Sequence, residues 1–304
     1  MSLKLSMSTR PGAWINMFEL LIEPFVDYLF MRRALVGSLV VSLGAVPVGV
    51  FMTLRRMSLT GDAMAHAILP GAAIAYLISG LSLLGLTIGG VSAGLIVASI
   101  AGLVARSSHL NEDTSLAAFY LLSLALGVLI ISLKQSNVDL FHLLFGNILA
   151  LDKAALLLLA SISSLTVIIM AGIYRPLVIE CADPTFLRRV GSASAIAHYG
   201  FLFLMVINLV AGFHALGTLM AIGIMVLPAT AARFWAVSMD GLLISALLIA
   251  GAGCYVGLLL SFHFDLPSGP SIIISVGIFC IWSILFGSNG SLLKKRAPSR
   301  HLVG

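Results

Sequence analysis

Charge is scarce in this chain. Only 10% of its 304 residues are Asp, Glu, Lys or Arg, whereas 60% are hydrophobic, and the mean hydropathy is +1.12. A soluble globular domain carries about 25% charged residues. The composition therefore excludes the ordinary soluble class and indicates a protein whose main solvent is the lipid bilayer.

Cysteine is scarce as well. The three cysteines, Cys181, Cys254 and Cys280, are scattered along the chain, and the last two lie inside apolar runs. A small hydrophobic residue serves equally well at such positions. The sequence predicts neither a disulfide nor a zinc knuckle.

Motifs for ATP hydrolysis and for zinc hydrolases are missing. None of the five lysines follows a glycine, so there is no G-x-x-x-x-G-K-[ST] phosphate-binding loop, and there is no H-E-x-x-H. The chain cannot hydrolyse ATP by a P-loop mechanism. We predict that it is not an enzyme and that it holds no resident cofactor.

The net charge of +5 does not indicate a nucleic-acid partner. The basic residues fall in short clusters at the ends of apolar runs. Membrane topology places basic residues at these positions. We therefore expect a membrane around the chain and no nucleic acid.

Long apolar runs occupy almost the whole chain from residue 34 to residue 287. A membrane-spanning helix needs about 20 mostly apolar residues. The sequence therefore predicts an all-α fold, a polytopic transmembrane helical bundle of about eight or nine spans in a single domain, 1–304. The candidate spans without charge are 34–54, 63–80, 83–105, 115–133, 154–174, 241–262 and 271–287.

The run from Tyr199 to Ala232 is long for one span and short for two. A hairpin near Phe213 and His214 gives nine spans and places 11 of the 17 basic residues on one side. Because cytoplasmic loops are rich in Lys and Arg, we expect that side, and the C-terminus, to be cytoplasmic. Arg32 and Arg33 fit this orientation poorly.

Three segments lie outside the predicted spans: an interfacial N-terminal segment (1–33), a cytoplasmic loop (175–198) and a cytoplasmic tail (288–304). In the loop, Asp183 and Pro184 are typical of a helix start and Gly191 of a helix stop. A short helix there would lie on the membrane face and contact a soluble partner. A solvated linker fits the composition equally well.

Asp62 and His66 are the clearest polar residues at predicted membrane depth. They are four residues apart and so lie on one face of a helix. An ionisable side chain in a span is costly and usually has a partner or a ligand, and this pair is able to share one divalent cation. The alternative is that Asp62 caps the span and His66 bonds a neighbouring carbonyl.

Further His and Asp residues lie in the predicted outer loops: His214 in the hairpin, His263 and Asp265 in a second loop, and Asp139 and His142 in a third. Imidazole and carboxylate suit manganese, zinc or iron by ligand type. Polar residues are also expected in any short loop, so both interpretations stay open.

Three ordered stretches, 54-LRRMSLTGDAMAHAILPG-71, 139-DLFHLLFGNILA-150 and 217-GTLMAIGIMVLPATAAR-233, resemble the zinc/manganese/iron permease family of ATP-binding-cassette (ABC) importers. The resemblance runs from about residue 30 to about residue 286 and is greatest to the manganese members. It implies a permease in the bacterial inner membrane that carries divalent manganese, zinc or iron into the cytoplasm.

The same resemblance implies the partners and the functional residues. The partners are two cytoplasmic ATPase subunits, an extracytoplasmic metal-binding protein and a second permease subunit, either another copy or a paralogue. Asp62 and His66 match the Asp and His of the family's G-D-A-x-x-H-A motif, which places them on the metal path. The loop after Arg175 would be the ATPase-coupling segment, with candidate residues Asp183, Pro184, Arg188, Arg189 and Gly191.

Two other functions compete with this interpretation. A secondary transporter driven by protons or sodium would also place a carboxylate and a histidine in the membrane, but would work without an ATPase. An intramembrane enzyme would rest on Gly90-Val91-Ser92-Ala93-Gly94, a formal G-x-S-x-G match. Without a strand-turn-helix context, and with 29 glycines in the chain, we expect that match to be accidental.

Overall fold

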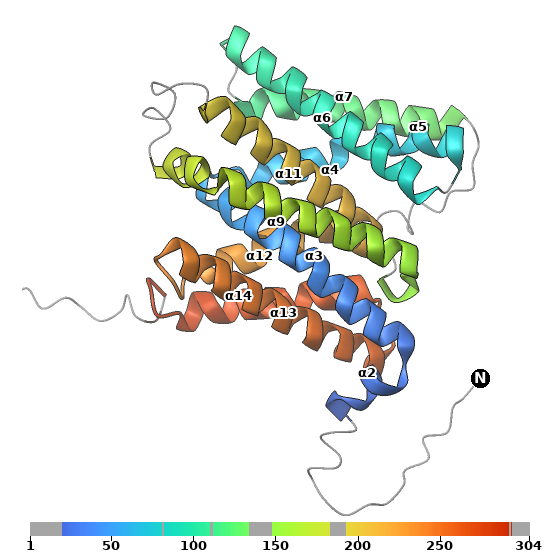
Figure 1. Cartoon of the computed structure of the whole chain (residues 1–304), viewed down its shortest axis with the longest axis vertical. Coiled ribbons are helices and arrows are strands. Elements are labelled where there is room, and N and C mark those ends of the chain that lie inside the picture. The colour runs from blue at the N-terminus through green and yellow to red at the C-terminus, as the bar shows by residue number, and fades with distance from the viewer. Residues whose placement is uncertain are drawn as a thin grey trace, which may run out of the picture.

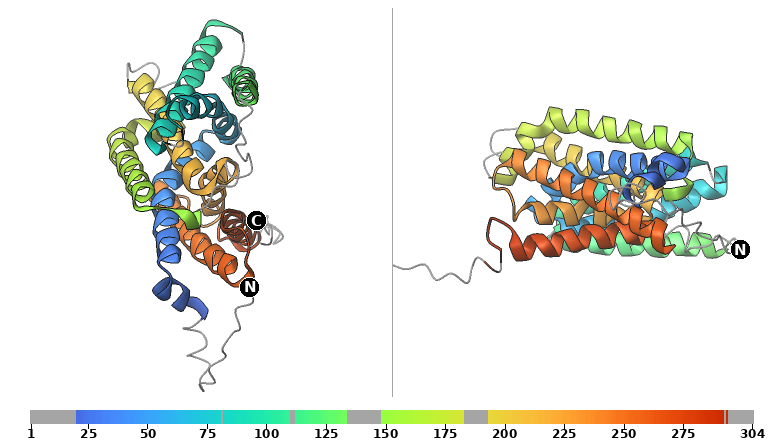
Figure 2. Two further views of the ribbon diagram at one scale, coloured as in Figure 1. Left: turned by 90° about the vertical axis from the view of Figure 1, so that its right-hand side faces the viewer. Right: turned by 90° about the horizontal axis from the view of Figure 1, so that it is seen from below.

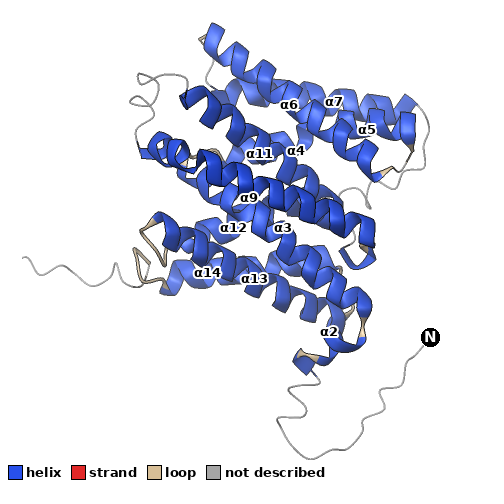
Figure 3. Ribbon diagram, in the orientation of Figure 1, coloured by secondary structure: helices blue, strands red, loops and turns tan. Residues whose placement is uncertain are grey.

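The computed structural model describes residues 20–80, 82–109, 112–133, 148–182, 193–291 and 293. Within them all regular structure is helical and no strand occurs (Figure 3), which confirms the all-α prediction. The elements are α2 (Glu23–Asp27), α3 (Leu29–Leu54), α4 (Ser58–Ala67), α5 (Leu69–Ser79), α6 (Leu83–Ser107), α7 (Glu112–Leu133), η1 (Ile148–Ala150), α9 (Lys153–Ala182), α11 (Ala193–Leu216), α12 (Thr218–Ala232), α13 (Met239–Phe264) and α14 (Ser268–Phe286).

Seven helical stretches are long and apolar enough to cross a membrane, and α4 and α5 together form one of them. Two shorter apolar stretches, within α7 and α12, add to these seven. The prediction of eight or nine spans is compatible with this count.

The helices run roughly parallel or antiparallel to one another, and they form layers (Figures 1 and 2). In Figure 1, α5, α6 and α7 lie at the top, α3, α9 and α11 in the middle, and α13 and α14 at the bottom. The central helix is α3, which packs against α9, α11, α12 and α13. Many apolar side chains on the outer helices are exposed, among them Ile88, Leu157 and Leu248. In a bilayer these side chains face lipid.

Successive helices reverse direction, so the C-terminal ends of α3, α6, α9, α12 and α14 meet at the same end of the bundle (Figure 1, left). We call it the basic end, because Arg55, Arg106, Arg175 and Arg233 lie at or near these helix ends. Contacts at this end include a hydrogen bond that Tyr174 donates to Asp240 and one that the backbone N–H of Asn289 donates to the carbonyl of Phe234. The predicted clustering of basic residues on one side is therefore present in the fold.

The hairpin in the 199–232 run lies later than predicted. The chain turns at Gly217 (φ 86°, ψ 163°), not at Phe213 and His214, which belong to the last turns of α11. This backbone conformation is accessible essentially only to glycine. The polar His214 suggested the turn, but the glycine makes it.

Helix α9 also extends further than predicted. Residues 175–182, which we assigned to the cytoplasmic loop, continue α9, so only residues 183–192 separate it from α11. The predicted span ended at Tyr174 because Arg175 ends the charge-free run, but the helix continues, and its charged Glu180 is buried and paired with Arg55. At the N-terminus, α3 begins at Leu29, inside the segment predicted to be interfacial.

Glycines in α6 allow close contacts with neighbouring helices. A side chain at Gly89 would overlap the backbone of Gly71 in α5, and one at Gly94 would collide with Val206 in α11. Small residues at such crossings let the backbones approach closely. Helix α6 therefore joins the upper layer of Figure 1 to the middle one.

Candidate functional site

Asp62 and His66 project from the same face of α4. Asp62 lies in the second turn of that helix, and His66 lies eight residues after Ser58, about 12 Å along the axis at 1.5 Å per residue. The His66 Nε2 and Asp62 Oδ1 atoms are 3.9 Å apart. A metal ion bound at about 2.1 Å from each atom spans such a gap.

The pair is accessible from outside the chain. The Asp62 side chain is 57% exposed and the His66 side chain 24%. Their neighbours Ala63, Met64 and Ala65 are buried, so these residues of the helix pack into the bundle. An ionisable side chain within a membrane span usually has a partner or a ligand.

Helix α7 positions His66 through contacts that the sequence does not predict. The Tyr120 ring stacks on the His66 ring with centroids 6.3 Å apart and an interplanar angle of 28°. One turn later on α7, the Ser123 hydroxyl donates a hydrogen bond of 3.0 Å to the carbonyl of Ala67. The only sequence signal was the i, i+3 spacing of Tyr120 and Ser123, which does not reveal which helix they face.

A break in the helix follows the pair. Pro70 lies at the start of α5 and has no backbone N–H, so it cannot donate to the carbonyl of His66 four residues earlier. The hydrogen bond from Ser123 falls at this break. His66 is thus held at a kink between two helical segments, with α7 fixing the geometry.

The described residues do not form a complete metal site: among them no three His, Cys, Asp or Glu side chains converge to hold a metal ion. Asp62 and His66 could offer two ligands, whereas Zn²⁺ usually takes four and Mn²⁺ prefers six. A metal ion bound by this pair would need further ligands from water, from other polar groups or from another subunit.

His263 and Asp265 lie at the opposite end of the bundle from the basic end. The Nε2–H group of His263 donates a hydrogen bond of 2.9 Å to the carbonyl of Leu20. Asp265 takes the left-handed conformation (φ 51°) that ends α13. The structure thus gives both residues local roles, and metal contact by either stays a prediction.

Several predicted residues lie outside the described part of the chain: Asp139, His142, Asp183, Pro184, Arg188, Arg189 and Gly191. His214 lies in the last turn of α11, but its side chain is not among the described ones. Their proposed roles stay predictions.

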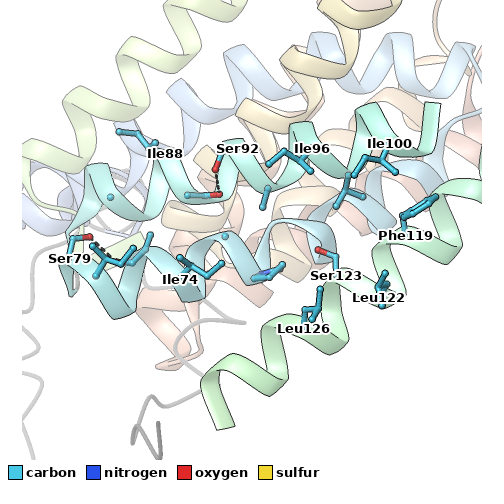
Figure 4. Close-up of a pocket in the computed structure, with 18 residues that line it drawn as sticks. Ile74, Ser79, Ile88, Ser92, Ile96, Ile100, Phe119, Leu122, Ser123 and Leu126 are labelled. Carbon is cyan, nitrogen blue, oxygen red and sulfur yellow. Dashed lines mark hydrogen bonds between the residues drawn. The ribbon is translucent and has the colours of Figure 1, made fainter. Parts of the chain in front are cut away.

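An apolar groove of about 610 Å³ lies between α5, α6 and α7, and none of its lining residues is His, Asp, Glu or Cys (Figure 4). Isoleucine, leucine and small side chains dominate the lining, which offers nothing to a metal ion. Ser92 lies in this groove and donates a 2.9 Å hydrogen bond to the carbonyl of Gly89 in its own helix. Its place in the middle of α6 excludes the strand-turn-helix geometry of a nucleophile elbow.

The chain is similar to known metal permeases over most of its length. It is 27% identical to the manganese import system permease protein ScaB of Streptococcus gordonii, over 92% of this chain and 99% of that protein. It is 30% identical to the chelated iron transport system membrane protein YfeD of Yersinia pestis, over 89% of each chain.

A solved structure and a family model agree with these relatives. The structure of PsaBC from Streptococcus pneumoniae in complex with Fab matches with a TM-score of 0.80 and 28% identity, over 92% of this chain and 99% of that one. The model of the ABC 3 transport family matches residues 27–287. Taken with the helical bundle and the Asp62–His66 pair, this match shows that the chain belongs to the ABC 3 transport family of metal-transporter permeases.

Proposed function

We propose that this chain is the membrane-spanning subunit of an ATP-driven importer of a divalent transition-metal ion, with Asp62 and His66 on the path of the ion. The observation that carries the proposal is an accessible carboxylate and imidazole, 3.9 Å apart on one face of α4, in a chain that is otherwise poor in ionisable side chains. Such residues are rare in membrane spans and mark ion pathways.

Manganese is the first candidate for the transported ion, and iron the second. The relatives of this chain include permeases named for manganese and for chelated iron. One carboxylate and one imidazole suit either metal and also zinc by ligand type. The proposal therefore ranks the three metals in the order manganese, iron, zinc.

The proposed importer has three kinds of partner. A cytoplasmic ATPase supplies the energy, since this chain has no phosphate-binding loop. An extracytoplasmic metal-binding protein delivers the ion. A second permease subunit, another copy or a paralogue, completes the path, and two identical copies would bring two Asp and two His side chains to it.

Transport in this scheme follows alternating access in the inner membrane of a bacterium. The ion enters from outside, contacts Asp62 and His66 for a short time, and leaves toward the basic end. A path through a membrane must bind the ion strongly enough to admit it and weakly enough to release it.

The test is uptake of radiolabelled manganese and iron by cells that express the permease with its ATPase and its binding protein. Asp62→Asn and His66→Gln keep the size of each side chain but weaken metal binding. We expect each variant to lower initial uptake at least tenfold at matched membrane expression.

His263→Gln and Asp265→Asn change the same residue types at the second candidate metal site, where the structure gives both residues local roles. Loss of uptake in Asp62→Asn and His66→Gln, with near-normal uptake in these two variants, would support metal contact on α4. Full uptake by Asp62→Asn and His66→Gln, with loss in His263→Gln and Asp265→Asn, would move the metal path to the C-terminal end of α13.

A further inference from the structure

A buried ion pair lies at the basic end, away from the proposed metal path. The Nη2 atom of Arg55 is 2.5 Å from Oε1 of Glu180, and the two side chains are only 8% and 9% exposed. The Arg55 guanidinium also lies over the ring of Phe201, 4.8 Å from its centroid. Three helices therefore meet at one charged contact: α3, α9 and α11.

Stability alone does not explain this pair. Removing two charges from water is costly, and replacing a buried ion pair by apolar residues of similar volume is often neutral or stabilising. Apolar side chains near it are fully buried: Phe201, whose ring the Arg55 guanidinium covers, and Leu177, three residues before Glu180 in α9. A directional contact that fixes the relative position of two helix ends is a better reason to keep two charges there.

Arg55 lies three residues before the start of α4, the helix that carries Asp62 and His66. Arg55 is the C-cap of α3, and Arg56 follows in the left-handed conformation (φ 60°). The backbone N–H of Met57 then donates a 2.9 Å hydrogen bond to the carbonyl of Met52, and α4 begins at Ser58. This tight, hydrogen-bonded turn makes the first turn of α4 move with Arg55.

The glutamate stands at the end of α9. Glu180 lies in the last turn of that helix, which ends at Ala182, just before the segment that the sequence predicts to contact the ATPase. Two turns earlier, Tyr174 contacts the Phe51 ring edge-on at 6.0 Å and donates a 3.2 Å hydrogen bond to Asp240 of α13. The end of α9 is thus fastened to α3 and α13 and cannot shift without moving them.

We propose that Arg55 and Glu180 are positioning residues that transmit movement from the end of α9 to α4, and so set the position of Asp62 and His66. When the ATPase displaces the end of α9, the ion pair moves the turn at 55–57 and the first turn of α4 with it. This inference rests on the proposed ATP-driven function. It names the contact that couples ATP hydrolysis to the position of Asp62 and His66.

The test measures how many manganese ions are transported per ATP hydrolysed by the permease–ATPase complex in proteoliposomes supplied with the binding protein. In the double variant Arg55→Met/Glu180→Leu, apolar side chains replace the pair at similar volume. We expect this complex to assemble and to hydrolyse ATP, but to transport at least tenfold fewer ions per ATP. Arg55→Lys keeps the charge. It should therefore keep at least half of the number of manganese ions that the unmodified complex transports per ATP.

Arg56→Gln is the matched control, because Arg56 is the next residue along and its side chain is exposed. Its transport ratio should equal that of the unmodified complex. If the double variant does not assemble, Glu180→Gln is measured in its place, at matched amounts of complex and with the same expected loss.

An unchanged ratio in the double variant, or in Glu180→Gln, would overturn the inference and leave the pair a packing feature. That result leaves the proposed function intact, because the unmodified complex still imports manganese with ATP. If the unmodified permease transports manganese without its ATPase, the proposed function itself fails, and the inference fails with it.

Discussion

At the scale of single residues, the site divides into a part that the sequence predicts and a part that it does not. Asp62 and His66 could be predicted because two ionisable residues four apart in an apolar run share a helix face. Tyr120 and Ser123 could not, because only the packing of α7 on α4 brings them to His66. Local periodicity does not say which distant helix covers a given face.

The ring of Tyr120 offers a test of this second part. Aromatic contacts contribute about 0.5–1.5 kcal/mol beyond area burial, equivalent to roughly two- to tenfold in an equilibrium. Tyr120→Ala should therefore lower manganese uptake several-fold by freeing the His66 ring, whereas Tyr120→Phe should keep it near the original rate.

Phe119→Ala is the control for that measurement, since Phe119 is the neighbouring aromatic residue and faces the apolar groove (Figure 4). This variant should leave manganese uptake unchanged. An equal loss of uptake in Tyr120→Phe and Tyr120→Ala would assign the effect to the hydroxyl group and not to the stacked ring.

At the scale of elements, the bodies of the helices were predictable and their ends were not. Each candidate span matches a helix or a pair of helices of the structure to within one residue at its C-terminal end or lies inside it, because about 20 apolar residues suffice to define a span. The end of α9 was placed too early because the charge-free run ends at Arg175, and because the partner of Glu180, Arg55, belongs to a distant part of the chain. The hairpin was predicted near Phe213 and His214, but the chain turns at Gly217, where the backbone conformation requires a glycine.

The crossing of α3 and α12 allows a quantitative test of packing between elements. A Cβ atom at Gly49 would overlap the carbonyl oxygen of Met225, so Gly49→Ala must push the two helices apart. Overpacking of this kind costs about 1–3 kcal/mol. The melting temperature of the detergent-solubilised protein should fall by several degrees.

Gly172→Ala in α9 is the matched control, because no atom lies within 4 Å of a Cβ built there. Alanine is favoured over glycine in a helix by up to about 1 kcal/mol, so this variant should melt at the same temperature or slightly higher. Equal melting temperatures for Gly49→Ala and Gly172→Ala would contradict the close approach of α3 and α12.

At the scale of the whole molecule, the sequence predicts a bundle but not the neighbours within it. Side chains that face lipid and side chains that face another helix are equally apolar, so hydropathy does not distinguish them. The central position of α3 and its contacts with α9, α11, α12 and α13 are therefore visible only in the structure. The shared location of the basic helix ends was predictable, because it follows from the number of spans alone.

The orientation in the membrane is a prediction at this scale. If the basic end is cytoplasmic, a cysteine at position 265 should face outward and one at position 288 inward. Starting from a variant that lacks Cys181, Cys254 and Cys280, Asp265→Cys should react with a membrane-impermeant maleimide in intact cells, and Ser288→Cys only after permeabilisation. The reverse pattern would invert the topology.

The central claim is that ATP drives metal through this permease. The direct measurement is manganese accumulation in proteoliposomes that contain the permease and its ATPase, with the binding protein added and with no proton or sodium gradient. Accumulation that requires ATP and stops with a hydrolysis-deficient ATPase is the predicted result. Accumulation that needs an ion gradient and continues without the ATPase would contradict the account and support a secondary transporter.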